Sequence, residues 1–175
     1  MRKILVVVDM QNDFIDGALG TAEAAKIVPK VVEKIKQYEP RNIYLTRDTH
    51  HENYLDTQEG YKLPVVHCVK GTEGWQLRAE VAEAAEGATV VDKPTFGSVE
   101  LASRLMVERA REALELELVG LCTDICVVSN ALLLKAAMPE VPITVDAACC
   151  AGVTPEKHRA ALETMRSCQI EVVNG

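Results

Sequence analysis

The sequence predicts an α/β fold in which helices cover both faces of a parallel sheet. Short apolar runs rich in β-branched residues, such as residues 4–8, have the length and composition of buried strands. Segments with apolar residues at helical spacing, such as residues 27–38, follow them. The two types alternate along the chain, which predicts parallel strands joined by helical crossovers. At 175 residues the chain fits one domain, and we expect residues 1–175 to form it.

The elements can be placed in chain order from their patterns. Strands are expected where apolar runs end at polar or turn residues: 4–8, 42–46, 89–91, 114–119, 141–145 and 170–173. Helices are expected over 27–38, 76–85, 98–113, 129–137 and 155–167. Ser98 and Thr154 are plausible N-caps, and Pro155 suits the first helical position. Residues 51–74 are expected to be irregular, and long loops in compact domains tend to be functional.

Composition restricts the class of protein. The formal net charge is -7 and the basic residues are scattered, which argues against nucleic acid or a membrane surface as a partner. The apolar run near the N-terminus stops at Asp9 and is too short for a signal peptide or a membrane span. Six cysteines show no CxxC spacing, so we expect reduced thiols and a cytoplasmic location.

The run from Leu118 to Val128 reads as a strand, a tight turn and the start of a helix. Thr123 or Asp124 can serve as the N-cap, which puts Cys126 in or next to the first helical turn. Unpaired backbone N–H groups and the helix dipole there favour a thiolate. The alternative is that Cys126 is a small buried hydrophobic residue.

Polar residues follow four of the predicted strands, at the sheet edge where ligands of parallel sheets bind. Cys126 can act as a nucleophile, Lys93 can stabilise its thiolate, and Asp9 can carry a proton. The backbone N–H groups of Cys122 and Cys126 can form an oxyanion hole. Taken singly, Asp9 could equally be a loop cap and Lys93 a solvated surface lysine.

A second group of residues suggests a metal site. Asp48 and His50 point to the same side of an extended segment, and His67 can close the site from the long loop. Carboxylate and imidazole ligands suit zinc, iron or manganese. Candidates for a further ligand are Glu59, His51 and Asp56; polar loop residues without a metal are the alternative. His158, on a predicted surface helix, is expected to be a bystander.

The ordered motifs resemble those of the isochorismatase-like cysteine hydrolases. The resemblance rests on Asp9-Met10-Gln11-Asn12-Asp13-Phe14, on Lys93-Pro94 with Phe96, on the Gly120–Val127 turn, and on Asp146-Ala147 with Ala151-Gly152. It covers essentially the whole chain. It implies a three-layer α/β/α fold with a six-stranded mainly parallel sheet, an Asp9–Lys93–Cys126 triad, and a cis peptide carried over to Leu121–Cys122.

Within that family, the nicotinamidase-like branch adds a metal. Asp48, His50 and His67 match its ligands, with Glu59 placed as a fourth, and the resemblance implies a divalent ion, zinc first with iron or manganese as alternatives. Phe14 and Leu121 are expected to contact the substrate. Phe96 and Leu63-Pro64 stand where many members have aromatic residues, so Phe14, Trp75 or Tyr61 is expected to supply the missing ring.

The resemblance implies a cysteine-dependent amidohydrolase, first of all a nicotinamidase that acts through a thioester. Three alternatives remain open at this point: a hydrolase of another small amide, ureido or carbamoyl compound; a non-catalytic metal- or ligand-binding protein; and a thiol redox protein built on Cys122 and Cys126. The expected partners are a small amide substrate and further copies of the chain in a homo-oligomer.

Overall fold

The computed structural model describes all residues 1–175 and contains one six-stranded parallel sheet, with strands in the order β3-β2-β1-β4-β5-β6. The strands are β1 (Arg2–Val8), β2 (Ile43–Asp48), β3 (Thr89–Lys93), β4 (Leu114–Leu121), β5 (Ile143–Ala151) and β6 (Glu171–Val173). The α-helices are α1 (Asn12–Ile15), α2 (Ala22–Ile35), α3 (Gln58–Lys62), α4 (Ala79–Ala84), α5 (Val99–Arg111), α6 (Val128–Ala137) and α7 (Pro155–Ser167). Short turns of other helix types are η1 (Pro40–Asn42), η2 (Tyr54–Asp56) and η3 (Thr123–Val127).

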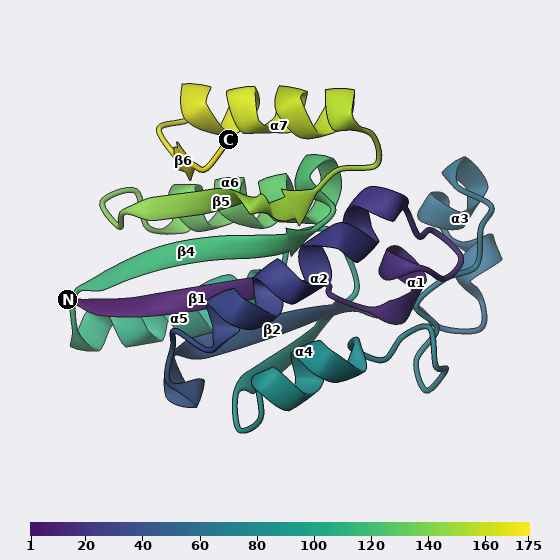
Figure 1. Ribbon diagram of the computed structural model, residues 1–175, viewed down its shortest axis with the longest axis horizontal. Helices are drawn as coiled ribbons and strands as arrows, with labels where there is room; N and C mark the ends of the chain where they lie inside the picture. Colours follow the sequence, from purple (N-terminus) through teal and green to yellow (C-terminus); the bar gives the residue numbers. More distant parts are fainter.

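Helices cover the sheet on both faces, which confirms the predicted three layers. In Figure 1, α2 lies in front of the sheet, and α5 and α6 lie behind it. The side chains of β1 alternate between the two layers: Ile4, Val6 and Val8 pack with α5, α6 and α7, whereas Leu5 and Val7 pack with α2 and α4. This alternation follows from the period of two in a strand.

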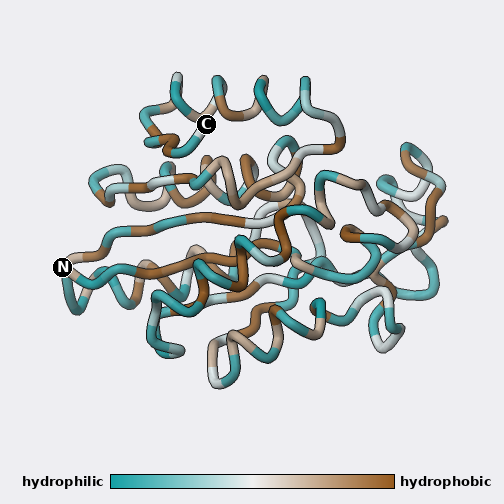
Figure 2. The backbone as a smooth tube through the Cα atoms, in the orientation of Figure 1, coloured by the Kyte–Doolittle hydropathy of each residue, from teal (hydrophilic) through white to brown (hydrophobic).

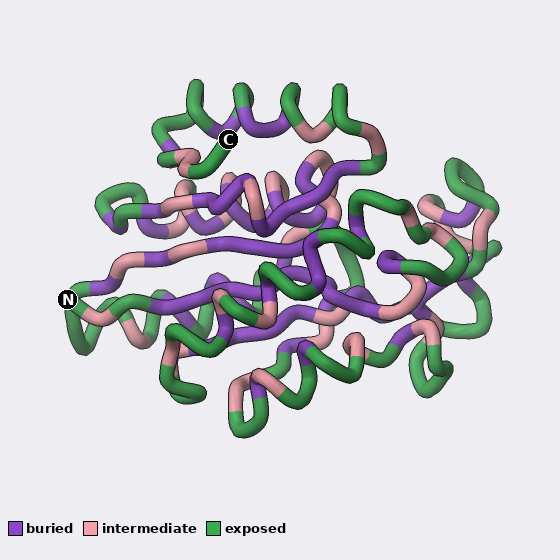
Figure 3. Tube along the Cα trace, viewed as in Figure 1, coloured by how far each residue is buried: buried purple, intermediate pink, exposed green.

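Burial on both faces explains why the central strands are continuous apolar runs. Hydrophobic residues follow β1 through the middle of the molecule in Figure 2, and the same strand is buried in Figure 3. The helices turn polar, exposed residues outward in both views. The structure contains no helix that is both long enough and apolar enough to span a membrane.

Most differences from the predicted elements concern their ends. Helix α2 begins earlier than expected because Thr21 caps it, accepting a hydrogen bond from the Ala24 amide. The predicted caps Ser98 and Thr154 are confirmed. Residues 51–74 are not wholly irregular, since η2 and α3 lie within them. Strand β5 runs to Ala151 and carries Cys149 and Cys150 as buried residues.

Gly120 lets β4 approach β1 closely just before the nucleophile turn. Its φ is +119°, a conformation that favours glycine, and a Cβ there would collide with the Val8 carbonyl oxygen. The pairing of β4 with β5 is also irregular between Leu118 and Gly120. The end of β4 is therefore shaped locally so that the next residues enter the carboxyl edge of the sheet.

Candidate active site

The carboxyl ends of four neighbouring strands bring the predicted site residues together. Asp48 and Lys93 are the last residues of β2 and β3 and are direct partners in the parallel ladder. Asp9 follows β1, and Cys126 lies in η3, just after β4. Because β1 lies between β2 and β4, these side chains meet at one edge of the sheet.

Lys93 is the centre of this group and is only 1% exposed. Its Nζ lies 2.7 Å from Asp9 Oδ2, 3.3 Å from Asp48 Oδ1 and 3.4 Å from Cys126 Sγ. It also donates to the Thr95 carbonyl oxygen at 3.0 Å. Burial lowers the pKa of this ammonium, but Asp9, Cys126 and Asp48 outweigh burial and hold its pKa above the usual value. Lys93 is therefore a fixed positive charge, not a surface lysine.

Asp9 is fully buried beside Lys93 and has a positive φ of 46°. Its Oδ1 accepts a hydrogen bond from Thr46 Oγ1 at 2.6 Å. Burial raises the pKa of Asp9, and the Lys93 charge offsets this only in part. A carboxyl group with a raised pKa next to a thiol can accept a proton from it and return the proton later.

Cys126 is 4% exposed and faces the Lys93 ammonium. Burial and the neighbouring Asp9 charge raise its thiol pKa well above the usual value, although Lys93 opposes them. Burial and Asp9 therefore oppose the thiolate that the helix start was expected to favour, and Lys93 favours it. Removal of the thiol proton needs a base, and Asp9 is the carboxylate placed for it.

The turn that carries Cys126 is a single π-helical turn with Cys122 at its N-cap position, rather than Thr123 or Asp124. The Ile125 and Val127 amides both donate to the Cys122 carbonyl. All peptide bonds are trans, so the cis peptide expected at Leu121–Cys122 is absent, and Cys122 instead enters the turn in an extended conformation. Such π-turns occur frequently at functional sites.

Thr123 and Asp124 instead hold the turn against the C-terminal part of the chain. Thr123 Oγ1 lies 2.8 Å from His158 Nδ1, and Asp124 Oδ1 accepts a hydrogen bond from the Val153 amide at 2.9 Å. His158, expected to be a bystander, lies outside the metal group and the cavity, but it is not a free surface residue, because the N-terminal end of α7 packs against η3. Burial lowers the pKa of His158, which favours the neutral ring that this contact suits.

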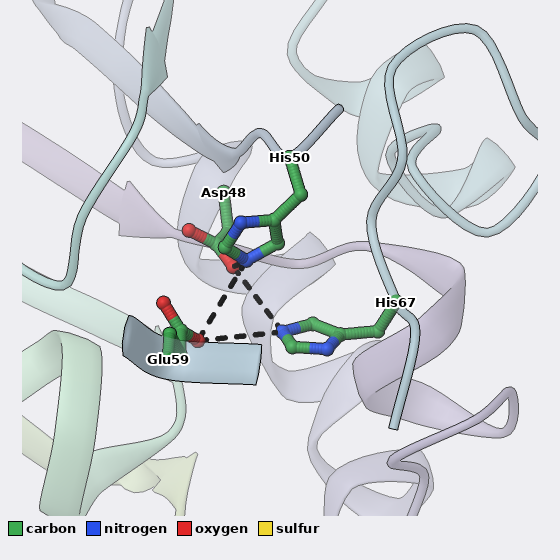
Figure 4. A group of neighbouring side chains, drawn as sticks. All are labelled: Asp48, His50, Glu59 and His67. Atoms are coloured by element: carbon green, nitrogen blue, oxygen red, sulfur yellow. Dashed lines mark hydrogen bonds and ion pairs between the residues drawn. The ribbon is translucent and has the colours of Figure 1, made fainter. Parts of the chain in front are cut away.

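The four predicted metal ligands form a compact group beside the thiol (Figure 4). Their ligand atoms all lie within 4.8 Å of one another. Asp48 Oδ2 is 2.9 Å from His50 Nε2 and 3.6 Å from His67 Nε2. Glu59 Oε1 is 3.7 Å from His50 Nε2 and 3.8 Å from His67 Nε2. Of the further candidates, His51 and Asp56 are exposed and lie outside the group.

Backbone pairing explains how residues so far apart in the sequence meet. His50 forms a parallel bridge with Val69: its amide donates to the Cys68 carbonyl, and the Lys70 amide donates to the His50 carbonyl. This brings His67 beside β2. Buried Tyr54 contacts both imidazoles edge-on, with ring centroids 4.7 Å from His50 and 5.0 Å from His67.

Gln11 is a further structural member of the site that the sequence did not reveal. Its buried side chain accepts from the Asp48 amide at 2.7 Å and donates to the Asp48 carbonyl at 2.9 Å. The same nitrogen donates to the Trp75 carbonyl at 2.9 Å. Gln11 thereby fixes the end of β2, where Asp48 projects. Its place two residues after Asp9 in the Asp9–Phe14 motif was the available signal.

These donors fit a divalent metal. Two imidazoles and two carboxylates form a nitrogen and oxygen ligand set typical of such ions. His67 Nδ1 lies 2.8 Å from the Val65 carbonyl oxygen, so Nδ1 carries the proton and Nε2 directs its lone pair into the group. Asp48, His50 and His67 are buried, and burial of so many polar atoms in one place is costly without a cation.

A cavity of ≈ 620 Å³ connects the metal group to the thiol. Asp48, His50, Glu59 and His67 line it together with Cys122 and Cys126; its aromatic walls are Phe14 and Phe96. Trp75 and Tyr61 do not line it: Trp75 stacks with Arg47, and Tyr61 is exposed. Leu121 also differs from expectation, because its side chain is buried in the core on the α2 side and does not reach the cavity.

Comparisons with known proteins agree with this arrangement. A family model described as the Isochorismatase domain matches residues 3–175. The crystal structure of a pyrazinamidase from Pyrococcus horikoshii in complex with zinc is similar, with a TM-score of 0.83 and 30% identity over 100% of both chains. A nicotinamidase/pyrazinamidase from Bacillus subtilis has a TM-score of 0.81 and 27% identity, with 98% of this chain and 99% of that chain covered.

A further relative is similar in sequence. The nicotinamidase/pyrazinamidase of Mycobacterium tuberculosis is 27% identical over 98% of each chain. The family match, the sheet order and the strand-end residues all agree with the resemblance noted in the sequence. The chain therefore belongs to the isochorismatase family.

Proposed function

We propose that this chain is a nicotinamidase that hydrolyses nicotinamide to nicotinate and ammonia through a thioester on Cys126. The observation that carries the proposal is the pairing of a thiol, held 3.4 Å from a buried lysine, with a four-donor metal group in the same cavity. The relatives named nicotinamidase/pyrazinamidase support the choice of an aromatic amide.

In the proposed reaction, Asp9 first accepts the proton of the Cys126 thiol. The resulting thiolate, stabilised by Lys93, attacks the amide carbonyl carbon. The N–H groups of Cys122 and Cys126 would stabilise the oxyanion. Asp9 then gives its proton to the departing ammonia, so the C–N bond breaks and a thioester remains. Asp9 next takes a proton from water, which hydrolyses the thioester and regenerates the thiol.

We assign Asp48, His50, Glu59 and His67 as the ligands of the divalent metal, with zinc as the first choice. The zinc-bound relative from Pyrococcus horikoshii supports this choice. A metal held by these residues would supply a Lewis-acid contact for the pyridine nitrogen of the substrate. Phe14 and Phe96, on the walls of the same cavity, would then hold the ring.

Two expectations about the protein in the cell accompany this proposal. All six cysteines are free, which suits a reducing compartment, and we propose a cytoplasmic location. The homo-oligomeric state expected from the family resemblance stays a prediction.

Cys126→Ala should abolish turnover while leaving the fold intact, because it removes the nucleophile and only one buried sulfur. We expect ammonia release from nicotinamide to fall by at least about 1,000-fold. The matched control is Cys168→Ala, which removes an exposed thiol outside the cavity and should leave turnover unchanged. Retained turnover in the folded Cys126→Ala protein would show that another group attacks the amide.

Asp9→Asn should separate acid–base catalysis from thiol ionisation. The Asp9 charge raises the Cys126 pKa, so its removal should lower that pKa and shift the pH midpoint of iodoacetamide labelling downward. Turnover should nevertheless be lost, because asparagine cannot carry the proton. Asp56→Asn, at an exposed acid outside the cavity, is the control and should change neither quantity. Retained turnover would contradict the role of Asp9 as proton carrier, and a midpoint that stays the same or rises would contradict its effect on the thiol pKa.

His67→Ala should weaken metal binding, because it removes one of two imidazole donors. We expect the zinc dissociation constant, measured by calorimetry on chelator-treated protein, to rise by at least roughly tenfold. His51→Ala is the matched control, since His51 is exposed and lies outside the ligand group. Equal zinc affinity in the two variants would remove His67 from the ligand set.

A further inference from the structure

Asn130 is a buried polar residue next to the nucleophile. It has no role in the reaction described above. It lies in α6, four residues after Cys126, and is 0% exposed. Its Nδ2 donates to the Cys126 carbonyl at 2.8 Å and to the Phe96 carbonyl at 3.1 Å. Its Oδ1 accepts from the Ser98 amide at 2.9 Å. One side chain thus joins the nucleophile turn to a second segment of the chain.

That second segment, residues 94–98, connects β3 to α5 and forms part of the cavity wall. Pro94, Thr95 and Phe96 line the cavity. The Thr95 carbonyl accepts a hydrogen bond from Lys93 Nζ, so the position of this segment also affects the direction of the lysine side chain. Asn130 makes the only side-chain hydrogen bonds from α6 to these residues.

Gly97 shows that the segment is packed closely against the same helix. A Cβ at Gly97 would lie 3.3 Å from the Ser129 carbonyl oxygen and 3.4 Å from Leu133 Cδ2. The contact with the Ser129 carbonyl oxygen is tighter than most Cβ contacts, so a methyl group at this position would press the segment away from α6 by a few tenths of an ångström, whereas the Leu133 contact is an ordinary van der Waals contact. The close approach at Gly97 and the hydrogen bonds of Asn130 both determine the distance between α6 and residues 94–98.

We propose that Asn130 is a positioning residue that holds Cys126 and Lys93 at their working separation. By binding the Cys126 carbonyl and the 94–98 segment at once, it fixes the nucleophile turn relative to the segment that directs Lys93. The amide group suits this task because one nitrogen donates twice while the oxygen accepts. This proposal rests on the proposed function, since it assumes that the Lys93–Cys126 contact stabilises the attacking thiolate.

Asn130→Ala removes all three hydrogen bonds, and its kinetics separate positioning from mere stability. We expect kcat for nicotinamide to fall by roughly 100-fold, as misplaced catalytic groups do, while KM stays within about twofold. Leu134→Ala is the matched control: Leu134 is a buried residue one turn further along α6, in the core and outside the cavity. It should lower the melting temperature but keep kcat, measured well below that temperature.

Gly97→Ala changes the distance between α6 and residues 94–98 from the side of the segment. It tests the positioning role if Asn130→Ala does not fold. It should also lower kcat with little change in KM, by a smaller factor than Asn130→Ala. Wild-type kcat in folded Asn130→Ala protein would overturn the proposal. If Asn130→Ala does not fold, wild-type kcat in Gly97→Ala would overturn it. An equal loss of kcat in Leu134→Ala would overturn it too, since general destabilisation would then explain the effect.

The rate of Cys126 labelling by iodoacetamide keeps this test independent of the substrate. Displacement of Lys93 should reduce the thiolate population, so labelling at neutral pH should slow by roughly tenfold in Asn130→Ala. If wild-type protein does not hydrolyse nicotinamide, the proposed function fails while slowed labelling still supports the positioning role. Unchanged labelling in both Asn130→Ala and Gly97→Ala would overturn the positioning role, whatever the substrate.

Discussion

The ion pair between the buried Lys93 ammonium and Asp9 is the interaction on which the site depends. A buried charge without a partner is costly, and Lys93 is 1% exposed. Asp9 lies 2.7 Å away, and Asp48 supplies a second carboxylate at 3.3 Å. The sheet order makes this possible, because β1, β2 and β3 are neighbours and end at the same edge. The fold thus places a permanent positive charge against the thiol of Cys126.

Asp48 joins this charge group to the metal group. One of its oxygens faces Lys93, and the other lies 2.9 Å from His50 Nε2. Burial alone would raise the Asp48 pKa, but the contact with His50 and the Lys93 charge hold it well below its usual range. Asp48 therefore stays a carboxylate, able to face a cation on each side. Asp48 thus belongs to both the charge group and the metal group, and Gln11 holds its backbone in place.

Sequence patterns predicted the parts of this arrangement that depend on strand ends. Apolar runs marked the strands, and the polar residue after each run marked the edge where Asp9, Asp48, Lys93 and Cys126 meet. His67 was predicted to close the metal site from the long loop, and the family resemblance favoured Glu59 among three candidates for a further ligand. The pairing of His50 with Val69 shows why His67 lies nearby.

Tertiary contacts that leave no periodic pattern could not be predicted in this way. The contact of His158 with Thr123 depends on how α7 docks, and the bonds of Asn130 depend on a turn 34 residues earlier in the chain. The Leu121 side chain points into the core, which follows from the exact register at the end of β4. The thiol pKa depends on the balance between burial, Asp9 and Lys93, which the order of residues does not reveal.

If Cys126 is the nucleophile, it forms a covalent acyl intermediate with the amide substrate. Intact-mass spectrometry of protein mixed with nicotinamide and quenched in acid within milliseconds tests it most directly. The account predicts a transient added mass equal to one nicotinoyl group, located on Cys126 by fragmentation and lost when the thioester is hydrolysed. Full turnover with no acyl adduct on any cysteine under single-turnover conditions, at every quench time, would contradict it.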